Sequence, residues 1–122
     1  MWHSLFLHRF FQTWIVLGLM LVGVSAQAMT LRELRALEKN DKQGENYVNY
    51  YLVGVIEGVL ETDAHRVRDG AKPTICLNGR RLQPSMARSL FDTELQRNDG
   101  VYEADMPVQL VLRNALATVY SC

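Results

Sequence analysis

The stretch YVNYYLVGVIEGVLE, residues 47–61, decides the fold class of this chain. Its valine, isoleucine and tyrosine content suits a strand, and each of its two glycines costs a helix about 1 kcal/mol relative to alanine. Its periodicity favours a helix, because apolar side chains recur at the spacing of one helical face: Val48, Tyr51, Leu52, Val55, Ile56 and Val59. A helix this apolar must be surrounded, so we expect residues 45–61 to form the central helix.

Helix signals flank this segment on both sides. Thr30 and Glu33 have the spacing of a capping box, and Pro84 and Pro107 each fall in the first turn of a predicted helix, where proline is tolerated. Between residues 61 and 82 the periodicity lapses and Pro73 excludes helix locally, so we expect a long connection there. The sequence predicts an all-α fold, a small four-helix bundle with antiparallel neighbours and helices over residues 30–39, 45–61, 84–97 and 106–121.

The first 28 residues predict a secretory signal peptide. Arg9 precedes an apolar run over about residues 10–24, and Ala26 and Ala28 have the A-x-A spacing of a cleavage site. The alternative is an uncleaved membrane anchor, but the run of about 15 residues is short of the ~20 that span a bilayer. We therefore expect cleavage after Ala28 and one exported, periplasmic domain over residues 29–122.

The charge of the mature chain is nearly balanced. Removing the signal removes Arg9 alone, which leaves 12 basic and 13 acidic side chains. A chain without a basic excess or a basic amphipathic helix is a poor candidate for binding nucleic acid or a membrane surface. We expect neither partner for the mature protein.

Two cysteines, Cys76 and Cys122, remain after processing. An even pair in a small exported domain predicts a disulfide, with a free thiol or a bridge between chains as the alternatives. Closing a loop of this length stabilises a fold by roughly 4 kcal/mol. If the last helix persists to the end of the chain, Cys122 falls on the same face as Val108, so we expect its thiol to point inward.

Candidate chemistry is sparse. Glu57, Glu61 and His65 would form a row on one helical face, and such a row could hold a divalent metal; a solvated polar face is the preferred interpretation. His65 is the one histidine of the mature chain, and no serine has the flanking glycines of a nucleophile elbow. We predict a protein that is not an enzyme and that needs no metal or cofactor.

Two surfaces of the central helix are candidates for contact. Tyr47, Tyr50 and Tyr51 are too close together to face one small core easily, so they belong either to the core or to a homodimer interface. Gly54 and Gly58 lie four residues apart, and this spacing predicts a place where a neighbouring helix packs closely.

The segment NDGVYEAD, residues 98–105, is an acidic loop. It is either a mobile linker or a protruding tip suited to a partner's cleft. In the second interpretation, Tyr102 is an aromatic anchor and the acidic groups surround it. The candidate partner-binding residues are Asp99, Tyr102, Glu103 and Asp105.

Four stretches carry a family resemblance: YYLVGVIEGV (residues 50–59), ICL (75–77), LQPSMARSL (82–90) and the terminal ALATVYSC (115–122). They resemble the Rap/Tai family, small periplasmic immunity proteins that protect Gram-negative bacteria against type VI secretion amidases. The resemblance implies an all-α fold, a Cys76–Cys122 disulfide, homodimers, and inhibition by occluding the active-site groove of a peptidoglycan amidase. Two features depart from the family pattern: a second cysteine pair is absent, and Asn78 stands where proline usually follows Cys-Leu.

The predicted function is therefore that of a periplasmic immunity protein whose partner is a peptidoglycan amidase toxin. The alternative is a periplasmic acid-stress chaperone of the HdeA type, or another non-enzymatic periplasmic binding domain. The chaperone is disfavoured because the polar residues are not rich in carboxylates.

Overall fold

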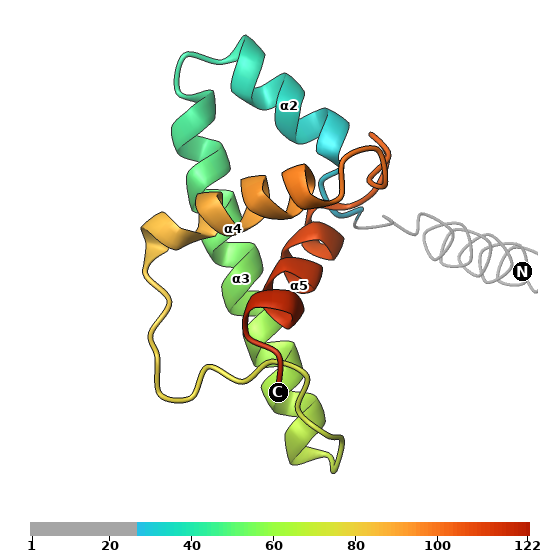
Figure 1. Ribbon diagram of the computed structural model, residues 1–122. Coiled ribbons are helices and arrows are strands. Elements are labelled where there is room, and N and C mark those ends of the chain that lie inside the picture. The colour runs from blue at the N-terminus through green and yellow to red at the C-terminus, as the bar shows by residue number, and fades with distance from the viewer. Residues whose placement is uncertain (1–26) are drawn as a thin grey trace, which may run out of the picture.

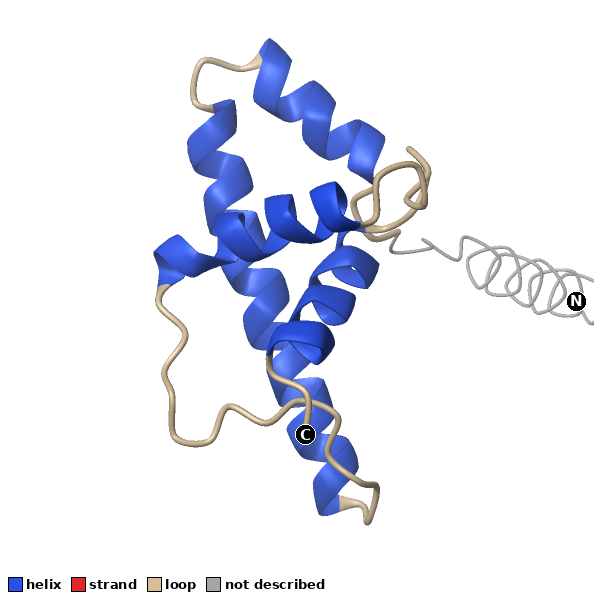
Figure 2. Cartoon of the chain, in the orientation of Figure 1, coloured by secondary structure: helices blue, strands red, loops and turns tan. Residues whose placement is uncertain are grey.

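Four helices make up the described part of the chain. The structure, a computed structural model, describes residues 27–122; the predicted signal peptide lies outside these residues except for its last two. Within this range there are no strands, and one disulfide joins Cys76 to Cys122, which confirms the predicted all-α fold (Figures 1 and 2). The helices are α2 (Leu31–Asn40), α3 (Gly44–Arg68), α4 (Pro84–Arg97) and α5 (Val108–Val119).

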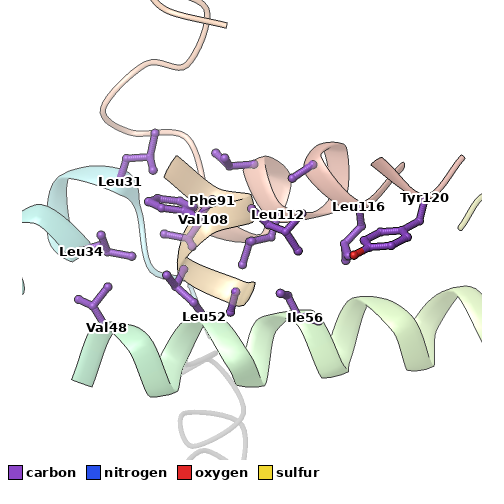
Figure 3. Close-up of a cluster of buried hydrophobic side chains, with 14 residues drawn as sticks. Leu31, Leu34, Val48, Leu52, Ile56, Phe91, Val108, Leu112, Leu116 and Tyr120 are labelled. Atoms are coloured by element: carbon purple, nitrogen blue, oxygen red, sulfur yellow. The ribbon is translucent and has the colours of Figure 1, made fainter. Parts of the chain in front are cut away.

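Helix α3 is the element on which the other three pack, as its apolar periodicity predicts (Figure 1). A short turn folds α2 back toward the first half of α3, and α4 crosses α3 at its middle. Helix α5 follows α3 in the same direction, because the long connection and α4 lie between them in the sequence (Figures 1 and 3). The expectation of antiparallel neighbours concerns helices joined by short connections, so it does not apply to this pair.

The core lies where the four helices meet (Figure 3). Thr30 caps α2 with the predicted capping box, in which its side chain accepts from the Glu33 backbone and Glu33 accepts from the Thr30 backbone. This cap begins α2 where its two buried leucines reach α3 and α5. The fully buried large side chains are Leu31, Leu34, Val48, Leu52, Val108, Val111, Leu112 and Leu116.

Helix α3 continues seven residues beyond the predicted end, to Arg68. Apolar periodicity could not reveal this extension, because its residues are mostly polar and exposed. Polar contacts hold it instead: Arg68 pairs with Glu61 at 2.8 Å, and basic side chains in the last turn complement the helix dipole.

Helix α5 ends earlier than predicted, at Val119, and Pro107 precedes the helix as its N-cap. Tyr120 leaves the helix and turns inward, where it is buried, while Cys122 is exposed. The expectation that Cys122 continues the buried helical face is therefore wrong. The disulfide forms through a different geometry: the backbone N–H of Cys76 donates to the Tyr120 carbonyl at 2.7 Å, and Ile75 and Ser121 form an antiparallel bridge.

A buried carboxylate on the extended part of α3 holds the long connection. Asp63 accepts hydrogen bonds from the Thr74 hydroxyl at 2.6 Å and from the backbone N–H groups of Thr74 and Ile75 at 3.3 Å each. These bonds, the Thr74 hydroxyl first, lower the pKa of Asp63 below its usual value. They also bring residue 76 to the position from which it reaches the C-terminus.

The Asp63→Asn variant tests this contact. A pKa lowered by folding contributes stability that is present above the unfolded-state pKa of about 3.9 and is lost as the pH falls through the folded-state pKa. We expect the variant to be less stable by about 1–3 kcal/mol at pH 6, and the two proteins to converge toward pH 2. Urea unfolding followed by circular dichroism at several pH values measures this, and a constant difference between the proteins would contradict it.

Candidate functional site

The loop between α4 and α5, residues 98–107, protrudes at one end of the molecule (Figure 1). Two turns shape its backbone: the Val101 N–H donates to the Asn98 carbonyl at 3.0 Å, and the Met106 N–H donates to the Glu103 carbonyl at 3.1 Å. Gly100 adopts a φ of 78°, which favours glycine because it lacks a Cβ. From here on, the acidic loop means residues 98–107, two residues more than the predicted segment of residues 98–105.

The second half of the acidic loop is tied to the start of α2. The first N–H groups of a helix have no partner within the helix. Here the N–H groups of Leu31 and Arg32 donate to the carbonyls of Met106 and Ala104, at 3.0 and 2.8 Å. The loop carbonyls thereby accept the hydrogen bonds that a preceding helical turn would have accepted. These bonds hold the loop against α2.

The first half of the loop is tied to the molecule through Tyr102. Its hydroxyl donates to the Glu94 carboxyl at 2.7 Å and accepts from the Asn114 amide at 3.0 Å. The Asn98 amide donates to the same Glu94 oxygen at 2.8 Å. Burial raises the pKa of Tyr102 above its usual value, and the neighbouring Glu94 acts in the same direction. Hydrogen bonds among side chains of α4, the loop and α5 therefore fix the first half of the loop from its buried side.

Glu94 is the residue that the sequence analysis missed. Its side chain is nearly fully buried, at 3% exposure. A signal was present, because Glu94 follows Leu90 and Phe91 at the spacing of the buried face of α4. A carboxyl group at a buried position needs hydrogen-bond donors, and the loop supplies them.

The outer side of the acidic loop carries three exposed carboxylates. Asp99, Glu103 and Asp105 are exposed, and Val101, which lies between Asp99 and Glu103 in the sequence, is 60% exposed. The Tyr102 hydroxyl is directed to Glu94 and Asn114 rather than to the tip of the loop. The exposed surface of the loop thus combines the apolar Val101 with three carboxylates, and hydrogen bonds hold the loop at both ends.

The tyrosines of α3 divide between core and surface. Tyr51 packs against the core, whereas Tyr47 and Tyr50 are 52% and 79% exposed. Gly54 and Gly58 are also exposed, and a Cβ built on either would meet no atom within 4 Å. The prediction that these glycines admit a neighbouring helix of the same chain is therefore wrong. We call Tyr47, Tyr50 and Gly54 the outer face of α3.

The candidate metal row does lie on a helix, because α3 continues through its whole length. Its members have other partners: Glu61 pairs with Arg68, and the Nδ1 atom of His65 lies 3.1 Å from the Asp69 carboxylate. Within residues 27–122, no three or more histidine, cysteine, aspartate or glutamate side chains gather in a way that could hold a metal ion.

Comparison of this chain with protein-family models, with curated proteins and with solved structures finds no match. Nor does any helix of the described range combine the length and the apolar character needed to span a membrane. A functional proposal must therefore start from the surfaces described above and from the sequence motifs.

Proposed function

We propose that this chain is a periplasmic immunity protein that binds and blocks a peptidoglycan amidase delivered by type VI secretion. The acidic loop is the part that enters the cleft of the toxin. The single observation that carries the proposal is the fixation of this loop, whose exposed carboxylates stand on a backbone that α2, α4 and α5 all hold.

Fixation favours inhibition for an energetic reason. Ordering a flexible loop on binding costs about 0.5–1.5 kcal/mol for each immobilised side chain, and a loop ordered beforehand avoids part of this cost. Tight protease inhibitors present pre-organised surfaces of this kind and change shape little on binding. A loop tied through Tyr102 and through the start of α2 meets the same requirement.

The charge of the loop indicates what kind of cleft it fits. Three carboxylates together with one exposed valine match an apolar slot with basic or hydrogen-bond-donating walls. Complementary charge mainly accelerates association and selects the partner. The predicted export signal and the four family-like stretches support the toxin class, because the immunity proteins that the chain resembles act on amidases in the periplasm.

Binding to the amidase encoded next to this gene tests the proposal. We expect the Asp99→Lys/Glu103→Lys variant to bind at least about tenfold more weakly than the wild type, and raised salt to weaken the wild type more than the variant. Isothermal titration calorimetry measures both effects. The matched control is Glu45→Lys/Asp69→Lys, which makes the same charge change at exposed positions at the two ends of α3. Equal affinities of the two variants would contradict the role of the loop.

We also propose that the protein forms a homodimer through the outer face of α3. A glycine in a helix costs about 1 kcal/mol, and no residue of the described chain packs against Gly54. A second copy of α3 could approach closely at Gly54, with Tyr47 and Tyr50 beside the contact. Tyrosines are enriched at the cores of protein interfaces.

The Gly54→Arg variant tests the dimer. The new side chain has open space in the monomer, so it should keep the fold and disrupt the contact between copies. The control is Ala36→Arg, an exposed position on α2. In sedimentation experiments we expect dimers for the wild type and the control, and monomers for Gly54→Arg. A wild type that stays monomeric at ~100 μM would contradict the proposal, because a stable dimer assembles below that concentration.

A further inference from the structure

A groove of about 550 Å³ lies between α3 and α5, and Thr74 and Ile75 of the long connection line part of it. Its floor is aliphatic, with Val55, Val59 and Ile75 partly buried beneath it. Gly58 lies among them and leaves the groove open, because a Cβ there would meet no atom within 4 Å. We call this the α3–α5 groove.

Two guanidinium groups line the α3–α5 groove, one from each helix: Arg66 and Arg113. Arg113 is exposed and has no side-chain hydrogen bond or ion pair with any residue of 27–122. Arg66 has one ionic partner, Asp63, at the long distance of 3.4 Å. Most of the N–H donors of both arginines are therefore free to bind a ligand.

Asp63 is the one carboxylate that lines the groove. Its single negative charge balances only one of the two guanidinium groups. The groove thus carries a positive excess beside an aliphatic floor. Its complement is a molecule with one negative head and an apolar body.

We propose that the α3–α5 groove binds a small amphipathic carboxylate. The planar, forked guanidinium group matches the two oxygens of a carboxylate in a bidentate pair. The volume of the groove lies within the range of small-molecule sites, about 300–1,000 Å³. An alkyl body of the ligand would cover the valines and fill the space above Gly58. This site is independent of the acidic loop and of the proposed inhibition.

Three small molecules test the contributions of the carboxylate and of the alkyl chain separately. Octanoate has both groups, acetate has the carboxylate without the long alkyl chain, and octanol has the alkyl chain without the carboxylate. We expect octanoate to bind at least about tenfold more tightly than either of the others, because each lacks one of the two complementary contacts. An NMR titration of the full mature chain measures the affinities, and the shifted amides should include those of Val55 and Val59. Equal affinities for octanoate and acetate would overturn the proposal.

Two variants test the location. Arg113→Gln removes one guanidinium, and Gly58→Leu fills the groove; each should weaken octanoate binding at least about tenfold. Arg35→Gln is the control, since Arg35 is exposed on α2 and lies outside the groove. Circular dichroism shows whether each variant is folded. Unchanged binding by folded Arg113→Gln would overturn the proposal. The proposal would also be overturned if a second copy of the chain covered the groove. In that case octanoate would fail to bind, and Gly58→Leu would alter the oligomeric state.

Discussion

We expect replacement of both cysteines, Cys76→Ser with Cys122→Ser, to lower the free energy of unfolding by about 4 kcal/mol. The disulfide closes a loop over a sequence separation of 46 residues, so its removal returns much conformational entropy to the unfolded chain. It also joins the long connection to the end of the chain, where few other contacts act: the backbone hydrogen bond from Cys76 to Tyr120, the isolated bridge between Ile75 and Ser121, and the Arg80 guanidinium 5.2 Å from the centre of the Tyr120 ring. Both segments should lose order in the variant.

Urea unfolding measures this loss. The matched control is the wild-type protein in a reducing agent, which should lose the same stability without any substitution. A third protein, Ser121→Ala, changes a neighbouring exposed residue and should unfold like the wild type. A loss below about 1 kcal/mol would show that the native contacts of the two segments suffice without the covalent bond.

The second large effect is expected at Glu94. The Glu94→Ala variant removes the carboxyl acceptor shared by Tyr102 and Asn98; the Tyr102 hydroxyl loses its acceptor, and the Asn98 amide keeps only its 3.3 Å bond to the backbone carbonyl of residue 94. We expect it to lower the free energy of unfolding by about 3 kcal/mol, because hydrogen bonds to an acidic side chain contribute about 1.5–3 kcal/mol each and partial rescue by water is expected. Amide exchange of residues 99–106 should accelerate far more than that of α3.

The control for this variant is Tyr102→Phe. It keeps the ring and removes only the hydroxyl, so we expect a smaller loss of about 1–2 kcal/mol and a smaller increase in exchange. If Glu94→Ala unfolds like the wild type, or if exchange in the loop stays unchanged, the network does not fix the loop. The structural basis of the proposed inhibition would then be lost.

The fold could be predicted where apolar periodicity determines it. Val48, Leu52 and Ile56 form the buried face of α3 as their spacing predicts, and the capping box of Thr30 begins α2. Residues 62–68 carry no apolar repeat, so the end of α3 could not be located. Its contacts come from Asp63 and from residues eleven and twelve positions away, which local patterns do not reveal.

The candidate site was predicted in composition and not in geometry. The carboxylates of the acidic loop are adjacent in sequence, so their shared exposure could be foreseen. The inward direction of Tyr102 depends on Glu94 and Asn114, on two different helices. Likewise, the end of α5 depends on Tyr120, which leaves the helix to reach the core and redirects Cys122. Such tertiary contacts override helical register.

Hydrolysis of peptidoglycan by an amidase encoded beside this gene, measured with increasing amounts of this protein, tests the central claim most directly. The proposal predicts inhibition that is complete near one chain per toxin. It also predicts that Asp99→Lys/Glu103→Lys abolishes most of this inhibition, whereas Glu45→Lys/Asp69→Lys inhibits like the wild type. Full amidase activity in the presence of excess wild-type protein, or a locus without an amidase, would contradict the account.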